Sequence, residues 1–573
     1  MTSRQPLSVI RLNTLFLSCL SCLLLGTACA RQPASDLSHA RHGIVVCADT
    51  LAASIGRDVL AAGGNAVDAA VATGFALAVT YPTAGNIGGG GFMVIRFNNG
   101  RTTALDFRER APAAARSEMF TETGGAYSSR RHHNSHLSVG VPGTVAGLAL
   151  AHERYGRLAW ADLVAPAQRL ASEGFPQTDG LARSLEGALR SFRSYPASRQ
   201  KFSRDGVPYK EGEVWAQPDL ARTLERIRLQ GRDGFYRGET ARLLAEEMRR
   251  GGGLITEADL ADYVAKERTP VTGTYRDFEI IGMCPPSSGG IALIEMLNIL
   301  EGYDLAEFGH NSPAYLHLVT EAMRCAFRDR ALYLADTDFA TVPIERLTSK
   351  AYAARLREGI DPARAGTSSP ADLALPDESP ETTHISIVDA DGNAVSMTYT
   401  LEAGYGSKIT VPGAGFLLNN EMGDFNGKPG LTDERGLIGT EPNLARPGQR
   451  MLSSMTPTIL VRDGRLFAVV GSPGGRTIIN TVLQVVLNII DFRMDITDAV
   501  AAARIHHQWL PDDISIESDG VPPETVQALE AMGYRVRMGG RQGHANCIVI
   551  DPRTGLRIGA ADQRQSNGAA IGY

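Results

Sequence analysis

The stretch 382–400, TTHISIVDADGNAVSMTYT, constrains the fold of this 573-residue chain most, because it predicts two strands joined by a short turn. A symmetric pairing about Asp391 in the turn places Thr382 opposite Thr400. Opposed side chains lie about 5 Å apart at Cβ on one face of a sheet, whereas Thr383 points to the other face. A slip of one residue would exchange the two faces. The hairpin therefore predicts two neighbouring threonine hydroxyls at one end of a sheet.

The segment before this hairpin, 361–381, is rich in Pro, Ser, Ala and Asp, which is typical of an exposed linker. A threonine hydroxyl is a weak nucleophile at neutral pH, and one way to activate it is to free its own α-amine as a base. That activation requires a cut between Glu381 and Thr382. Adjacent threonines at a strand start are more often merely structural, so the hypothesis depends on residues elsewhere in the chain.

The composition indicates an ordinary globular protein, with 43% hydrophobic and 21% charged residues. A net charge of −6 without a long basic run argues against nucleic acid as a partner. Three of the seven cysteines lie in the first 29 residues. We interpret the others as buried small side chains rather than disulfides or metal ligands. They are Cys47, Cys284, Cys325 and Cys547.

The N-terminal stretch 1–29 is interpreted as an export signal. Arg4 and Arg11 supply a positively charged region before a short apolar segment. This segment is too short to span a bilayer, and ACA after it fits a cleavage site. The same stretch resembles a bacterial lipoprotein box with Cys29 as the lipidated residue. Both interpretations place the protein in the periplasm, outside the cell or on a membrane face.

Strand patterns occur towards both ends of the chain, and the region from about 140 to 360 is largely helical in its apolar spacing. Asn65 is the predicted N-cap of a helix that ends before Pro82. A second hairpin is predicted around RDG at 462–464, followed by an apolar helix. The simplest assembly is one layered domain of sheets and helices built from both halves of the chain.

Four further stretches carry groups suited to binding an amino acid. GSPGG at 471–475 lies between a strand and a helix, where backbone N–H groups can stabilise an oxyanion. LSSM offers two hydroxyls to a carboxylate, LLNNEMGDF offers two carboxylates to an ammonium group, and DFRERAP ends a strand with an arginine. Each stretch alone has an ordinary structural explanation, but together they suggest a substrate with an α-ammonium and a carboxylate. The residues are Arg108, Glu421, Asp424, Ser453 and Ser454.

The stretches TTHISIVDADGNAVSMTYT, LLNNEMGDF, RMLSSMTPT and GSPGG strongly resemble the γ-glutamyltransferase (glutathione hydrolase) family. NIGGGGFMV, DFRERAP, GVPGTVAGLALAHERYG and PPSSGG upstream, and ARIHHQWLP downstream, extend the resemblance over nearly the whole mature chain. Because this family belongs to the N-terminal nucleophile hydrolases, the resemblance implies an α+β fold, a four-layer αββα sandwich formed jointly by two subunits. It implies neither a metal nor an organic cofactor.

The resemblance also implies autocatalytic cleavage between Glu381 and Thr382, which gives a large subunit 30–381 and a small catalytic subunit 382–573 in one heterodimer. Thr382 would attack the γ-glutamyl amide of glutathione or a related compound, and the acyl-enzyme would pass to water, an amino acid or a dipeptide. The implied roles are a hydrogen bond to the nucleophile for Thr400, the oxyanion hole for Gly474 and Gly475, the α-carboxylate site for Arg108, Ser453 and Ser454, and the α-ammonium site for Glu402, Glu421 and Asp424.

Two positions depart from the family pattern. Glu402 stands where many members carry Asn, although both side chains can accept a hydrogen bond from an ammonium group. The segment 428–450 resembles the lid loop of lidded members, but Arg435 stands where a pocket-covering Tyr is seen. A charged side chain there is expected to alter the choice between water and an acceptor.

Two alternative functions stay open at this point. A cephalosporin acylase of the same superfamily would cleave a glutaryl group, which lacks the ammonium that Glu421 and Asp424 would bind. A periplasmic binding protein would use the pocket without turnover and would remain one uncut chain. His132, His133 and His136 are interpreted as residues of a solvated loop. His506 and His507 are interpreted as structural residues.

Overall fold

The computed structural model describes residues 38–369, 382–431, 433, 439–518 and 520–573. The predicted export signal with Cys29, the predicted cleavage residue Glu381 and the loop residue Arg435 lie outside these described residues. Within them, every helix is too short or too polar to cross a membrane.

The described residues form two seven-stranded sheets. The first sheet has the order β19 (Ala569–Gly572), β2 (Ile44–Cys47), β10 (Thr383–Val388), β11 (Ala394–Thr400), β3 (Gly90–Arg96), β4 (Thr102–Phe107) and β7 (Lys266–Arg268). The second has the order β1 (Ser38–Ala40), β18 (Arg557–Ala561), β17 (Asn546–Ile550), β13 (Arg465–Val470), β12 (Thr458–Arg462), β9 (Phe278–Gly282) and β8 (Val271–Tyr275). Both halves of the chain therefore contribute strands to each sheet.

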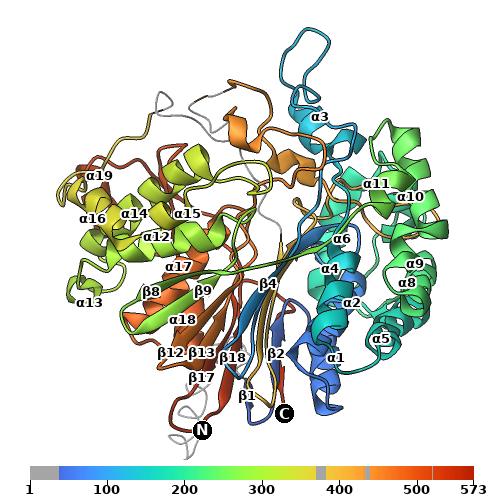
Figure 1. Cartoon of the computed structure of the whole chain (residues 1–573), viewed down its shortest axis with the longest axis horizontal. Helices are drawn as coiled ribbons and strands as arrows, with labels where there is room; N and C mark the ends of the chain where they lie inside the picture. The colour runs from blue at the N-terminus through green and yellow to red at the C-terminus, as the bar shows by residue number, and fades with distance from the viewer. Residues whose placement is uncertain (1–37, 370–381, 432, 434–438, 519) are drawn as a thin grey trace, which may run out of the picture. The chain divides into compact units, whose positions relative to one another are not determined.

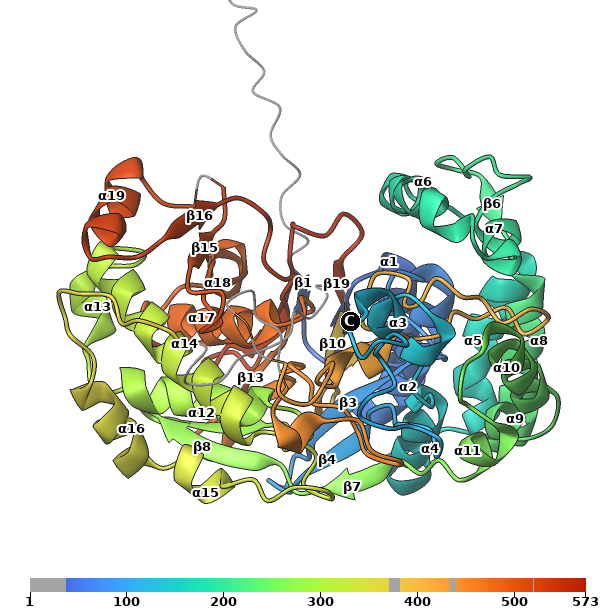
Figure 2. The same ribbon diagram turned by 90° about the horizontal axis from the view of Figure 1, so that it is seen from above.

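Helices cover the outer faces of the two sheets, which pack against each other in the middle (Figure 1). The helices on the first sheet include α1 (Thr50–Ala61), α2 (Ala66–Thr80) and α4 (Thr144–Tyr155), with α5 (Trp160–Glu173) packed on α2 and α8 (Pro218–Gln230) packed on α5. Those on the second include α12 (Gly289–Leu300) and α17 (Thr477–Ile490), with α14 (Pro313–Tyr333) and α16 (Lys350–Glu358) packed on α12. The view from above shows the two groups of helices on opposite sides of the sheets (Figure 2). The predicted four-layer αββα sandwich is confirmed.

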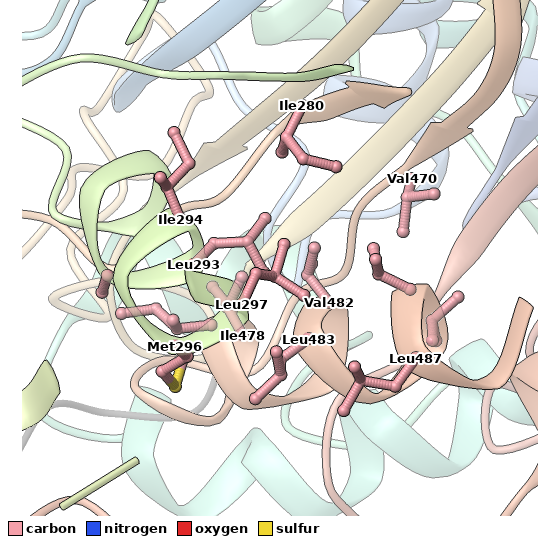
Figure 3. Close-up of a cluster of buried hydrophobic side chains, with 14 of the residues drawn as sticks. Ile280, Leu293, Ile294, Met296, Leu297, Val470, Ile478, Val482, Leu483 and Leu487 are labelled. Carbon is pink, nitrogen blue, oxygen red and sulfur yellow. The ribbon is translucent and has the colours of Figure 1, made fainter. Parts of the chain in front are cut away.

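The first sheet contributes side chains to two hydrophobic cores, because successive residues of a strand point to opposite faces. In β3, Phe92 and Val94 point towards the second sheet, whereas Met93 and Ile95 point towards the helices on the outer face. The core that contains Phe92 and Val94 also includes apolar side chains of α12 and α17. Leu297 and Val482 of these two helices meet in Figure 3. Central strands such as β2 and β3 are thus buried on both faces, which accounts for their nearly continuous apolar sequences.

The hairpin register expected from the sequence is confirmed. β10 and β11 pair antiparallel, with Thr383 opposite Tyr399 and Val388 opposite Ala394. The predicted N-cap of α2 is confirmed as well, because the Asn65 side chain accepts the amides of Val67 and Asp68 in a full capping box.

One part of the sequence interpretation was incomplete. The region expected to be largely helical also contains the hairpin β8–β9, which lies at the edge of the second sheet beside β12. Each strand has only five residues, so neither gives a long alternating pattern. Of the four cysteines in the described chain, Cys47, Cys284 and Cys547 are buried as predicted, whereas Cys325 is partly exposed.

Candidate active site

Four residues lie side by side at the end of the first sheet, one position beyond its last fully paired row. That last row runs across four neighbouring strands and contains Phe107, Gly91, Tyr399 and Thr383. The next row contains Arg108, Gly90, Thr400 and Thr382, whose side chains point between the two sheets because residues alternate along each strand. Gly90 supplies no side chain, and a Cβ there would lie 2.5 Å from the carbonyl oxygen of Phe107. The row therefore leaves a gap between the arginine and the two threonines.

The Gly-rich stretch 86–91 holds Thr400 in place. Asn86 Nδ2 donates a hydrogen bond to the Thr400 carbonyl oxygen at 2.9 Å, and a Cβ on Gly89 would lie 2.0 Å from the same oxygen. The Glu402 amide donates to Thr400 Oγ1 at 2.9 Å. Thr382 is 4% exposed, so its hydroxyl lies almost wholly inside the protein.

A cavity of about 20 Å³ brings together all the sequence-predicted site residues except Gly474 and the cleavage residue Glu381. This volume is enough for about one water molecule. Ile478 and Met455 complete the wall and were not expected from the sequence. The lining residues are Arg108, Thr382, Thr400, Glu402, Glu421, Asp424, Ser453, Ser454, Met455, Gly475 and Ile478.

The turn GSPGG connects β13 to α17 and requires glycine at its last two positions. Gly474 and Gly475 have φ values of 136° and 57°, in the region that favours glycine. A Cβ on Gly474 would also lie 2.5 Å from Thr477 Oγ1, which donates to the Gly474 carbonyl oxygen at 2.7 Å. Gly475 lies at the start of α17, where unpaired backbone N–H groups favour negative charge.

Arg108 is the buried cation at the centre of the site. Its Nη1 lies 2.5 Å from Glu421 Oε2, and its Nη2 bonds to Asp424. Its Nη2 also donates to the Leu452 carbonyl oxygen at 3.1 Å. Arg108 therefore connects the short helix η3 (Glu421–Asp424) to the loop that carries the two serines.

Burial shifts the pKa values of the charged groups around Arg108. It raises the pKa of Glu421 well above its ordinary value, although the Arg108 guanidinium opposes the shift. Burial likewise raises the pKa of Glu109 to about 8, again against the effect of Arg108, whose Nη1 lies 3.6 Å away. For Arg108 itself, burial lowers the pKa, but Glu421, Asp424 and Glu109 outweigh it and raise the pKa above its ordinary value.

Glu109 predicts a pH dependence of stability. Its pKa is raised on folding, so between pH 4.5 and about 8 the unfolded chain has lost a proton that the folded chain still binds. The favourable contribution is complete below pH 4.5 and falls by up to about 1.4 kcal/mol per pH unit as the pH rises towards 8. We expect the Tm of Glu109→Gln, relative to wild type, to rise between pH 5 and 8. The exposed Glu118→Gln is the control, and Tm curves that stay parallel for Glu109→Gln would contradict the assignment.

The two serines are positioned by residues far away in the sequence. The Ser453 amide donates to the Pro286 carbonyl oxygen at 3.0 Å, and Ser288 Oγ donates to the Ser453 carbonyl oxygen at 2.7 Å. Arg330 of α14 donates to Ser454 Oγ at 3.0 Å. The sequence stretch PPSSGG therefore acts as a support for this loop, and Arg330 is a positioning residue that the sequence analysis missed.

Asn419 supports the acidic side of the site and was also missed. Its Nδ2 donates to the carbonyl oxygens of Gly88 and Gly140, both at 2.8 Å. Its Oδ1 accepts the Glu421 amide at 3.1 Å. This single side chain thus fixes the position of Glu421 relative to the backbone at Gly88 and Gly140. The glycines themselves were the one sequence feature that indicated a close approach of the backbone here.

The interpretation of the RHHNSH stretch as a solvated loop was wrong for all three histidines, because His132 is fully buried and the side chains of His133 and His136 are only 19% and 12% exposed. His132, in α3 (Ser129–His133), is fully buried, and its Nε2 lies 3.1 Å from the Met422 carbonyl oxygen. His133 Nδ1 lies 3.9 Å from Glu402 Oε1. Burial lowers the pKa of His133 to about 4, so it is uncharged at neutral pH and packs under the acidic helix. The His132 ring packs against Phe120 and contacts the Met422 carbonyl oxygen. These contacts bury a residue whose polar neighbours in the sequence predicted exposure.

The other histidines lie away from the cavity lining. His136 Nε2 contacts Glu247 at 2.9 Å. His506 and His507 are buried and bond to Gln508 and Asp512, in agreement with the structural interpretation. Among the described residues, no cluster of three or more His, Cys, Asp and Glu side chains could bind a metal ion.

Glu402 is directed into the site by an unusual backbone conformation. Its φ is 77°, and Asn420 Nδ2 donates to its Oε2. Glu402, Glu421 and Asp424 thus line the same cavity as Gly475 of the GSPGG turn. A cavity lined by two threonines, a turn that favours negative charge, one guanidinium and several carboxylates has the groups needed to bind a zwitterion and to cleave an acyl bond.

Comparisons with known proteins agree with this geometry. A family model described as gamma-glutamyltranspeptidase matches residues 52–572. The chain is 46% identical to the glutathione hydrolase proenzyme of Escherichia coli strain K12 over 96% of both chains, and 38% identical to an acylase ACY 1 proenzyme of a Pseudomonas strain over 93% of both. A cephalosporin acylase structure from Bacillus halodurans aligns with a TM-score of 0.83 at 28% identity, covering 96% of this chain and 99% of that one.

A second solved structure is more similar in sequence. The Helicobacter pylori gamma-glutamyltranspeptidase aligns at 44% identity with a TM-score of 0.55, covering 57% of this chain and 93% of that one. The family model matches nearly the whole chain, and the Escherichia coli relative covers 96% of it. The chain therefore belongs to the gamma-glutamyltranspeptidase family.

Proposed function

We propose that this chain is a self-processed γ-glutamyltransferase that hydrolyses glutathione and related γ-glutamyl compounds, or transfers their γ-glutamyl group to amino acids and dipeptides. The observation that carries the proposal is the position of Arg108, Glu421 and Asp424 beside Thr382 in one buried cavity. Relatives named glutathione hydrolase proenzymes support it.

The spacing along the row fits a glutamyl group. Arg108 and Thr382 lie three strands apart, or about 14 Å at Cα. The cavity of about 20 Å³ holds only about one water molecule, so a glutamyl group would have to widen it on binding. We assign the α-carboxylate to Arg108, Ser453 and Ser454, and the α-ammonium to Glu402, Glu421 and Asp424. The substrate would then exchange the ion pairs within the protein for pairs with its own two charges.

The chemical steps use residues of the chain alone. Thr382 Oγ1 attacks the γ-carbonyl carbon while its freed α-amine takes the hydroxyl proton. Gly474 and Gly475 stabilise the oxyanion, the C–N bond breaks, and the proton leaves on the departing amine. Water or an acceptor amine then attacks the ester, the bond to Oγ1 breaks, and a proton returns to Oγ1. Thr400 donates a hydrogen bond to the nucleophile.

The proposed activation requires processing of the precursor. We propose cleavage between Glu381 and Thr382, a large subunit 30–381 and a small subunit 382–573 that remain together. The interleaving of strands from both segments in each sheet supports a stable heterodimer. We also propose export through the signal 1–29, with lipidation of Cys29 as the alternative to simple cleavage of the signal.

A comparison of two donors separates this activity from that of an acylase. We expect the γ-glutamyl anilide to be hydrolysed at least about 100-fold faster, in kcat/KM, than the glutaryl anilide. The glutaryl compound lacks the ammonium and leaves the acidic groups of the site without a substrate cation. Equal rates, or a faster glutaryl reaction, would favour an acylase instead. No turnover of either donor by folded protein would favour the binding protein.

A further inference from the structure

A short loop, residues 542–545, packs against the GSPGG turn. A Cβ on Gly474 of the turn would lie 3.1 Å from the Gly543 Cα and 3.3 Å from the Gly543 amide nitrogen. In the other direction, a Cβ on Gly543 would lie 2.5 Å from Ser472 Oγ and 2.9 Å from the Pro473 carbonyl oxygen. The two backbones therefore touch, and a shift of the loop would be passed directly to the turn.

Ser472 connects this loop to the turn through two hydrogen bonds. The His544 amide donates to Ser472 Oγ at 3.0 Å. The same hydroxyl donates to the Pro473 carbonyl oxygen at 2.7 Å. Because a trans peptide bond is planar, fixing the direction of the Pro473 carbonyl also fixes the direction of the Gly474 N–H, which points the opposite way. The position of His544 thus bears on the N–H that would face an oxyanion.

Arg504 holds the first residue of the loop. It is buried between α18 (Ile496–Ala501) and β14 (Ile505–His506). Its Nη1 donates to the Gln542 carbonyl oxygen at 2.6 Å, and its Nη2 donates to the Val500 carbonyl oxygen, also at 2.6 Å. The Gln542 carbonyl belongs to the peptide bond that leads to Gly543. Arg504 therefore orients the peptide group that touches the turn.

Asp562 holds the other end of the loop and is itself bonded to Arg504. This buried carboxylate follows β18, and its Oδ2 accepts hydrogen bonds from Arg504 Nη2 at 2.7 Å and from the Ala545 amide at 2.9 Å. The Asp562 amide donates to the Ala545 carbonyl oxygen at 3.0 Å. One buried ion pair therefore fixes the loop on both sides of Gly543 and His544.

Glu517 and Arg564 complete the network around this ion pair. Glu517 Oε1 accepts the Gln542 amide at 2.8 Å, and Arg564 lies 2.5 Å from the Glu517 carboxylate. Burial raises the pKa of Asp562, but Arg504 and Arg564 outweigh this effect and lower the pKa below its ordinary value. Asp562 is therefore ionised at neutral pH, and loss of Arg504 would remove its closest cation.

We propose that Arg504 is a positioning residue for the reaction: through the loop 542–545, it holds the Gly474 N–H in the direction that stabilises the oxyanion. Arg504 does not line the cavity at Thr382, so it acts through the loop rather than on the substrate. The inference rests on the proposed function, which gives Gly474 its oxyanion role. Because the negative charge develops only in the transition state, a misdirected N–H slows acylation and deacylation but leaves donor binding unchanged.

The test is Arg504→Met, assayed with γ-glutamyl-p-nitroanilide and with rates expressed per cut chain. We expect kcat to fall about 20-fold while the donor KM stays within about twofold of wild type. A γ-boronic acid analogue of glutamate forms a tetrahedral adduct with a nucleophilic hydroxyl and so mimics the oxyanion intermediate. Its affinity should fall by the same factor as kcat, whereas the affinity for glutamate itself should not change.

Arg557→Met is the matched control. Arg557 is another buried arginine that donates to backbone carbonyl oxygens, those of Asp389 at 2.8 Å and Arg41 at 2.6 Å. Asp389 follows β10 at the end away from Thr382. We expect this variant to lose stability but to keep kcat and boronic acid affinity within about twofold of wild type. An equal fall of kcat in Arg557→Met and Arg504→Met would reduce the effect to general destabilisation and would overturn the inference.

Ser472→Ala keeps the test decisive if Arg504→Met does not fold. It removes no charge, breaks the connection between the loop and the turn, and should lower kcat about fivefold at an unchanged donor KM. A folded variant with the kcat of wild type, or with equal losses of boronic acid and glutamate affinity, would overturn the positioning role alone. Wild-type protein that hydrolyses no γ-glutamyl anilide would overturn the proposed function, and the positioning role with it.

Discussion

Thr382→Ala is expected to leave the precursor uncut and to lower γ-glutamyl hydrolysis by at least about 10⁴-fold. The substitution removes the hydroxyl that would act in both cleavage and catalysis. It adds no bulk, and Thr382 precedes β10 rather than lying within it, so folding should be retained. Gel electrophoresis and the rate with γ-glutamyl-p-nitroanilide measure the two effects.

Thr383→Ala is the matched control for this variant. Thr383 is as buried as its neighbour, but it pairs with Tyr399, and its side chain points towards the outer helices. We expect this variant to cut itself and to retain activity within about tenfold, because the packing change is a single methyl and hydroxyl. A fully active Thr382→Ala protein, or a cut one, would contradict the role of Thr382.

Arg108→Met is expected to lower kcat/KM for γ-glutamyl donors by more than about 100-fold and to destabilise the protein. Methionine fills much of the volume but leaves Glu421 and Asp424 buried without their guanidinium partner. Loss of one partner from a buried ion pair costs about 3–5 kcal/mol. Because we propose that Arg108 binds the substrate carboxylate, we expect a higher KM for the donor as well as a lower Tm.

Arg110→Met is the matched control, two residues further along the same stretch. Arg110 lies 5.9 Å from the Tyr263 ring centroid and does not line the cavity. Its donor KM should stay within about threefold of wild type. If Arg108→Met and Arg110→Met had the same donor KM, Arg108 would not be the carboxylate site.

The sequence predicted the parts of the site that depend on local pairing. The turn around Asp391 determines the hairpin register, and the register places Thr382 and Thr400 in one row. The turn GSPGG could be predicted too, because it lies between an apolar strand and an apolar helix, and its last two glycines have the positive φ values that favour glycine. The family resemblance supplied the roles of Arg108 and the acidic residues, and the structure brings these residues into one cavity.

The remaining features depend on contacts between distant segments. Arg330 reaches Ser454 from α14, and His132 becomes buried only because Met422 and Phe120 pack around it. The pairing of Arg108 with Glu421 could not be predicted, since the sequence suggested that each would bind the substrate.

The most direct test of the account is the intact mass of the purified protein after it is mixed with a γ-glutamyl donor and quenched in acid. We predict two chains, of which the smaller begins at Thr382 and carries one γ-glutamyl group on that residue. The Thr382→Ala protein should give one longer chain without the adduct. An uncut wild-type chain that still turns over the donor, or a γ-glutamyl group on a different residue, would contradict the central claim that Thr382 is the nucleophile released by self-cleavage.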